Sequence, residues 1–149
     1  MGDCRLFSVV EVSPGTLINT GEQQVSSGGS AVDTAVEGGL QTVFGGGSVS
    51  GTLINNGEQQ VSSGGSAVDT TINGGLQTVF GGGSVSGTLI NNGEQQVSSS
   101  GSAVGTTING GLQTVSVAEM SQGLSLITGS SESPVVAVLL TQPLTMEGQ

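Results

Sequence analysis

The sequence has no histidine, tryptophan or tyrosine, and Arg5 is the only basic residue among its 149 residues. Without histidine, neither a Ser-His-Asp nor a Cys-His catalytic group can form. The side chain that most often binds metal ions is absent for the same reason. We therefore predict a protein that is not an enzyme and that carries no cofactor.

The shortage of bases also gives the chain a formal net charge of −10. This charge would repel a nucleic acid, which would also find no patch of Lys and Arg to neutralise its phosphates. The composition therefore excludes nucleic acid as a partner.

Cysteine and long apolar runs are equally scarce. Cys4 is the only cysteine, so no intramolecular disulfide can form. The apolar run from Val135 to Leu140 is far shorter than the ~20 residues of a membrane-spanning helix. The segment from Met1 to Val12 lacks the longer apolar stretch of a secretory signal peptide, so we expect no signal peptide in this chain.

Glycine, with 28 residues, and internal repetition are what the sequence has in abundance. The segments Gly51 to Val68 and Asp69 to Ser86 align without a gap, which defines an eighteen-residue unit. Alternate copies are more alike than neighbouring copies, so a period of two units is superimposed. Six copies, the last incomplete, begin at Gly15, Asp33, Gly51, Asp69, Gly87 and Gly105. Such a period is typical of solenoids, in which each repeat forms one coil and buries its apolar face against its neighbours.

Five positions of the unit, here called slots, keep their chemistry in every copy. The Ile slot holds Ile18, Val36, Ile54, Ile72, Ile90 and Ile108. The Val slot holds Val25, Val43, Val61, Val79, Val97 and Val115. The Ala slot holds Ala31, Val49, Ala67, Val85 and Ala103. A Thr slot lies two residues before the Ile slot and a Gln slot two before the Val slot, so each shares a strand face with its aliphatic partner. We expect core ladders that include Ile54, Ile72, Ile90, Val61, Val79, Val97, Gln59 and Gln77.

Each coil is expected to contain three short strands, formed by Thr-x-Ile, by Gln-x-Val and by the segment around Ser-Ala. Turns rich in Asn and Gly separate them, because these residues tolerate positive φ. The glycine density and the absence of a 3.6-residue apolar stripe argue against helix. We predict an all-β, parallel β-solenoid of about six coils over residues 15–115, preceded by a non-repeat lead-in over residues 1–14 and followed by a non-repeat tail over residues 116–149.

Two interpretations of the tail stay open. It either folds over the end of the solenoid as a cap, with Val135 to Leu140 as one strand, or it results from a frame shift. The second interpretation is permitted because Val117 to Met120 can be encoded so that another frame reads Gly-Gly-Asn, as the repeat requires. In that case the protein is a truncated remnant of a longer one.

The slot after the first turn alternates between a carboxylate and leucine. It holds Glu22, Leu40, Glu58, Leu76, Glu94 and Leu112. Two unit charges about 4.8 Å apart repel by roughly 0.9 kcal/mol in water, and alternation halves this by doubling the distance. The row is either a surface that binds a metal or a partner, or a solvated face on which the alternation weakens the repulsion between carboxylates.

The repeat motif, Thr-x-[Ile/Val]-Asn-x-Gly-x-Gln-x-Val-x-x-Gly-Gly-Ser-[Ala/Val], resembles the strand-loop-strand repeat of AIDA-type self-associating autotransporter passengers, which are adhesins of Gram-negative bacteria. The resemblance covers about residues 13–115. It implies a right-handed parallel β-helix at the cell surface, or secreted, that mediates adherence, autoaggregation or biofilm formation. A curli-like, self-assembling fibril protein is the alternative, because parallel strand edges and Gln ladders invite strand addition.

The resemblance also implies partners and modification. The partners would be a second copy of the protein or a ligand on a host or bacterial surface. Membrane attachment would require a C-terminal barrel, and we expect none within this chain. A dedicated heptosyltransferase modifies Ser or Thr in some members of the family. The matching loop hydroxyls here are Ser26, Ser27, Ser62, Ser63, Ser98 and Ser99.

Overall fold

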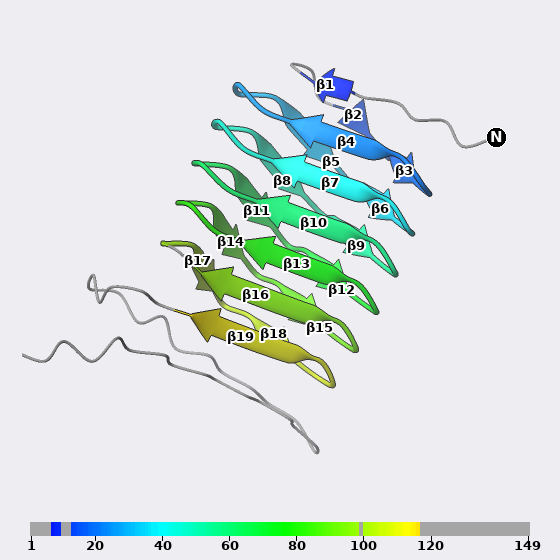
Figure 1. Ribbon diagram of the computed structural model, residues 1–149. Coiled ribbons are helices and arrows are strands. Elements are labelled where there is room, and N and C mark those ends of the chain that lie inside the picture. Colours follow the sequence, from blue (N-terminus) through cyan, green and yellow to red (C-terminus); the bar gives the residue numbers. More distant parts are fainter. Residues whose placement is uncertain (1–6, 10–12, 99, 117–149) are drawn as a thin grey trace, which may run out of the picture.

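The computed structural model describes residues 7–9, 13–98 and 100–116, and all regular elements in these ranges are β-strands (Figure 1). Nineteen strands form three parallel sheets, one of seven strands and two of six. These ranges contain no helix that could cross a membrane. The predicted all-β solenoid of about six coils is confirmed.

Sheet A contains the longest strands and carries the Gln and Val slots. Its strands, in order across the sheet, are β1 (Phe7–Val9), β4 (Glu22–Val25), β7 (Leu40–Val43), β10 (Glu58–Val61), β13 (Leu76–Val79), β16 (Glu94–Ser98) and β19 (Leu112–Ser116). Exposure alternates along β10 and β13, which is the period of two expected when one face is buried.

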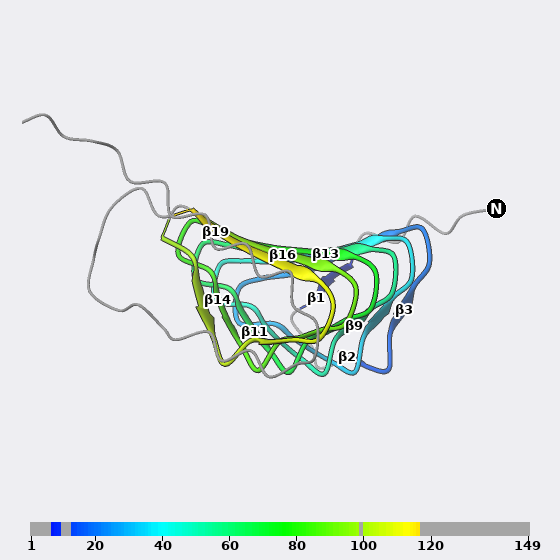
Figure 2. The ribbon, with the colours of Figure 1, turned by 90° about the horizontal axis from the view of Figure 1, so that it is seen from below.

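Sheets B and C complete each coil with shorter strands. Sheet B contains the Ala slot and consists of β2 (Ser13–Pro14), β5 (Ser30–Val32), β8 (Ser48–Ser50), β11 (Ser66–Val68), β14 (Ser84–Ser86) and β17 (Ser102–Val104). Sheet C contains the Ile slot and consists of β3 (Leu17–Ile18), β6 (Ala35–Val36), β9 (Leu53–Ile54), β12 (Thr71–Ile72), β15 (Leu89–Ile90) and β18 (Thr107–Ile108). The end-on view shows the three sheets around one interior (Figure 2).

The register is one repeat unit per coil from β4 onward. Gln59 pairs with Gln77 and Val61 with Val79, so equal slots lie side by side in neighbouring coils. The stretch expected to be a lead-in also contributes strands. Ser13 of β2 pairs with Ala31, one full repeat unit later, whereas Phe7 of β1 pairs with Gln23, which is two residues short of a full unit. This shift conceals β1 from a comparison made at a fixed period. The interpretations of the tail concern residues 117–149, which lie outside the described residues.

Two apolar columns run along the interior. One contains the residues of the Ile slot, and the other joins the Val slot of sheet A to the Ala slot of sheet B. Within them, Ile54, Ile72, Ile90, Val61 and Val79 are fully buried and Val97 is 4% exposed. β-Branched side chains suit these positions because they pack well on a pleated surface.

A polar column of the Gln and Thr slots accompanies the two apolar columns. Gln59 and Gln77 are fully buried, and each amide donates to the Gln of the preceding coil. Gln77 Nε2 lies 2.6 Å from Gln59 Oε1, and Thr70 Oγ1 donates to the same oxygen at 3.4 Å. Both lone pairs of that buried acceptor are therefore used, which lowers the free-energy penalty of burying the amide.

Candidate functional site

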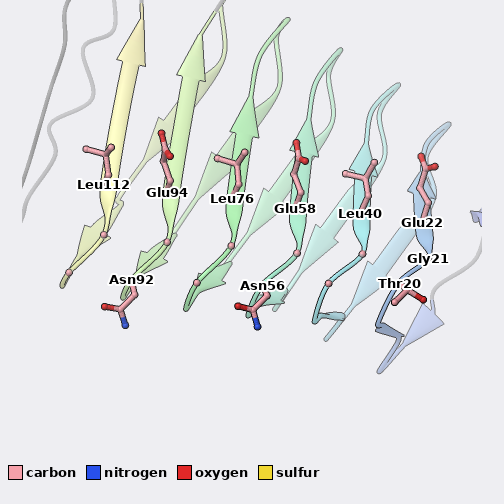
Figure 3. Close-up of a pocket in the computed structure, with 18 residues that line it drawn as sticks. Thr20, Gly21, Glu22, Leu40, Asn56, Glu58, Leu76, Asn92, Glu94 and Leu112 are labelled. Atoms are coloured by element: carbon pink, nitrogen blue, oxygen red, sulfur yellow. The ribbon is translucent and has the colours of Figure 1, made fainter. Parts of the chain in front are cut away.

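A long groove lies on the outside of the solenoid, where the first turn of each coil leads into sheet A (Figure 3). Its volume is about 1120 Å³, and all six coils line it. The floor is a glycine column made of Gly21, Gly39, Gly57, Gly75, Gly93 and Gly111. One wall is the Glu/Leu row, made of Glu22, Leu40, Glu58, Leu76, Glu94 and Leu112. The opposite wall is a turn row, made of Thr20, Gly38, Asn56, Gly74, Asn92 and Gly110.

The stacking of the coils requires the glycines of the floor. A Cβ at Gly75 would collide with the carbonyl oxygen of Gly57 and with Cγ2 of Ile54. Gly39, Gly93 and Gly111 have equally little room. Close approach of two backbones is possible only without a side chain. The groove is therefore a consequence of tight coil packing. It is not among the sites predicted from the sequence, although glycine in all six copies of this slot is a signal of close backbone approach.

The two walls alternate together, with a period of two coils. A coil with Glu58 has Asn56 on the opposite wall, so both walls carry polar side chains. The next coil has Leu76 opposite Gly74, so the only side chain that it contributes to the walls is apolar. Figure 3 shows the glutamates and leucines in a single row across the strands, with Asn56 and Asn92 on the turn side. Polar and apolar segments therefore alternate along the groove. A segment with a glutamate is here called a gate, and a segment with a leucine is called a notch.

Each glutamate of the row is held by the glutamine two residues later. Gln24 Nε2 donates to Glu22 Oε1 at 2.8 Å, and Gln60 Nε2 donates to Glu58 Oε1 at 2.7 Å. Gln96 holds Glu94 in the same way at 2.8 Å. These neutral partners orient the carboxylates without neutralising them. Residues 7–9, 13–98 and 100–116 contain no Lys, Arg or His, so no base in this part of the chain pairs with them.

The row does not bring carboxylates together. Glu58 pairs in register with Leu40 on one side and Leu76 on the other, so the nearest carboxylates of the row are two coils apart. Among the described residues, no three His, Cys, Asp or Glu side chains gather in a group that could hold a metal ion.

The predicted glycosylation serines lie on the second turn, between sheets A and B, and they differ in exposure. Ser27 and Ser63 are exposed and have positive φ angles of 53° and 48°. Ser26 and Ser98 are half-buried, and Ser62 is only 9% exposed. Ser99 lies outside the described residues.

The burial of Ser62 follows from its neighbours in the stack. The amide of Ser62 donates to Val43 O, and that of Phe80 donates to Val61 O, so the slot holds Phe44, Ser62 and Phe80 in successive coils. Ser62 therefore lies between two large aromatic side chains. Ser98 has Phe80 on one side only, because its partner on the other side is Ser116.

Comparison with known proteins gives one informative match. No protein-family model matches the chain, and no curated protein sequence matches it. A solved structure described as a TibC-catalysed hyper-glycosylated TibA55–350 fragment is similar, with 49% sequence identity and a TM-score of 0.71. The match covers 74% of this chain, which spans 43% of the length of that fragment.

The similarity agrees with the resemblance implied by the repeat motif. TibA is an autotransporter adhesin, and its passenger fragment shares with this chain both the parallel β-solenoid and nearly half of the aligned residues. The chain therefore belongs to the AIDA-type autotransporter adhesin passengers, of which it carries part of the repeat region.

Proposed function

We propose that the chain is part of a non-enzymatic adhesin passenger, displayed at the cell surface or secreted, that mediates adherence, autoaggregation or biofilm formation. The observation that supports this role is the similarity to the TibA passenger fragment in both sequence and fold. A rod of regular coils suits adhesion because it repeats the same surface along its length.

Beads coated with the purified chain test this proposal. We expect them to aggregate or to bind to bacterial or epithelial cells, whereas beads coated with an unfolded Ile72→Asp variant remain dispersed. The variant differs from the chain by one side chain, so the comparison shows whether adhesion requires the folded solenoid. Beads with the folded chain that neither aggregate nor bind cells would contradict an adhesive role for this part of the passenger.

A heptosyltransferase is the proposed modifying partner, because the similar TibA fragment is glycosylated by TibC. Exposure favours Ser27 and Ser63 over Ser26 and Ser98, and it disfavours Ser62 most. Co-expression with such an enzyme should add sugar mass that Ser63→Ala reduces and Ser62→Ala leaves unchanged. Equal losses from the two variants would contradict this ranking.

Fibril assembly is the second candidate, and Gln113 supports it. Its Oε1 atom is buried and accepts no hydrogen bond from the described residues, although the equivalent oxygen in the preceding coil, Gln95 Oε1, accepts from Thr106 and Gln113. A further coil bearing glutamine would supply a donor. Thioflavin-positive fibres that grow with a lag phase would support assembly, and a chain that stays monomeric in seeded solutions would exclude it.

A further inference from the structure

We propose that the groove binds an extended cationic peptide in the polyproline II conformation, with a Lys or Arg at every third residue. The inference rests on the proposed adhesive function and deepens it, because it names the chemical class of one partner. Three features of the groove support it: the sign of its charge, the spacing of its carboxylates and the alternation of its walls.

The negative charge of the groove favours a cationic partner. Glu22, Glu58 and Glu94 are half-buried, and each is hydrogen-bonded by a neutral glutamine rather than by a base. A ligand that brings a base to each gate would form a charge-assisted contact, which is stronger than a neutral hydrogen bond. A second copy of the same region would repel the groove, because that region contains no base.

The spacing of the carboxylates selects the conformation of the ligand. Neighbouring strands of a sheet lie about 4.7–4.9 Å apart, so glutamates on every second coil are separated by about 9.4–9.8 Å. Polyproline II rises about 3.1 Å per residue, so every third residue recurs at about 9.3 Å on the same face. A β-strand repeats its face at about 6.6 Å and then at about 13.2 Å, and neither distance matches. An α-helix repeats its face at about 5.4 Å and then at about 10.8 Å, and neither distance matches.

The apolar notches suit the residues between the bases. Leu40 and Leu76 line the notches, and neither Gly38 nor Gly74 opposite them adds a side chain. Prolines at the two positions between consecutive bases add no charge and favour the polyproline II conformation. Such a peptide is already extended before binding, so it loses little conformational entropy. Grooves that recognise proline-rich segments use this same advantage.

The test uses a fluorescent peptide of four Lys-Pro-Pro triplets and the whole chain. The matched control peptide has four Lys-Pro-Pro-Pro units, which keep the number of charges but place them about 12.4 Å apart. Fluorescence anisotropy should show tighter binding of the triplet peptide. Binding should weaken as salt rises, because exposed charges are screened beyond about 10 Å at 0.1 M.

Two variants locate the binding. Glu58→Gln removes one groove charge and keeps an oxygen that can accept from Gln60, and we expect it to weaken triplet binding about twofold to fivefold. Replacing Glu22 and Glu94 as well should multiply the effect. Glu37→Gln is the control, because Glu37 accepts from Asn55 but does not line the groove. Circular dichroism verifies that each variant remains folded.

Equal affinity for the two peptides, or equal effects of Glu58→Gln and Glu37→Gln, would overturn the proposal. Binding of a cationic oligosaccharide that depends on Glu58, without binding of the triplet peptide, would also overturn it and would identify a sugar polymer as the occupant. The bead assay is independent of both results. Coated beads that adhere while the peptide does not bind would leave the adhesive function standing and remove only this partner.

Discussion

The solenoid contains two amide ladders with the same period, one inside and one outside. The inner ladder consists of glutamines, such as Gln59 and Gln77, that are fully buried and joined by hydrogen bonds of 2.6–2.7 Å. The outer ladder consists of asparagines, where Asn73 Nδ2 donates to Asn55 Oδ1 at 3.0 Å on the exposed first turn. Water can replace a partner in the outer ladder but not in the inner one. Similar hydrogen bonds should therefore differ several-fold in their contribution to stability.

The inner ladder also constrains how coils can pair. A strand that slipped by one residue would turn its Gln and Val slots outward and expose both. It would also leave the buried amides of the next coil without acceptors. A slip by a whole coil would restore the contacts of the inner ladder except at the ends. The ladder therefore specifies the register within a coil, while the number of coils depends on the length of the repeat array.

The largest effect should come from placing a charge beside the inner ladder. Ile72→Asp buries a carboxylate in the apolar column of the Ile slot, and we expect a loss of several kcal/mol or no folding at all. Leu76→Asp on the outer row should cost only about 1–2 kcal/mol, mostly through repulsion by Glu58 and Glu94 in the adjacent coils. Thermal unfolding followed by circular dichroism measures both. Equal destabilisation would contradict the separation of inside from outside.

Removing one glutamine of the inner ladder should cause the next largest loss of stability. Gln77→Leu leaves the Gln95 amide and the Thr88 hydroxyl without their acceptor. Unsatisfied buried groups cost about 1–3 kcal/mol each, so we expect a loss of about 3 kcal/mol. For a domain of about 100 residues, this lowers Tm by roughly 12–24 °C.

Gln113→Leu provides the matched control for that substitution. Gln113 lies in the last described coil, and its Oε1 accepts no hydrogen bond from residues 7–9, 13–98 and 100–116. The substitution should therefore lower Tm by less than half as much as Gln77→Leu does. The same decrease at both positions would show that side-chain volume, and not the hydrogen-bonded ladder, determines the loss.

The outer ladder should be much less sensitive. Asn73→Ala breaks the bonds to Asn55 and from Asn91, but all of these groups can be solvated. We expect a loss of about 0.5 kcal/mol or less, which chemical denaturation can measure. A loss as large as that of Gln77→Leu would mean that the outer ladder is shielded from water.

Salt should have the smallest effect on folding stability, but it should strengthen association between copies of the chain. The inner ladder carries no charge, so its contribution should not change with ionic strength. The net charge of −10 opposes lateral contact between copies, and raising salt toward ~0.5 M screens this repulsion. Sedimentation should show self-association strengthening with salt. Association that weakens with salt would point to an attractive ionic contact instead.

The sequence alone determined the period, the three strands of each coil and the parallel stack, because equal slots in a solenoid must meet equal slots. The Gln and Thr slots could also be assigned to the same strand faces as the Val and Ile slots from their spacing. Glu22, Leu40 and Glu58 were recognised as an alternating row for the same reason.

Only the tertiary structure decided what surrounds these positions. The groove exists because backbones at the glycine column approach too closely for a Cβ, and slot chemistry does not reveal that distance. Ser62 is buried while Ser63 is exposed because Phe44 and Phe80 flank only the former, so identical residue types acquire different accessibility from neighbours one coil away. Strand β1 joins sheet A at a spacing shorter than the repeat unit, which a fixed period cannot find. In each case the deciding quantity is the contact between coils, and that contact forms only when the chain has wound once around.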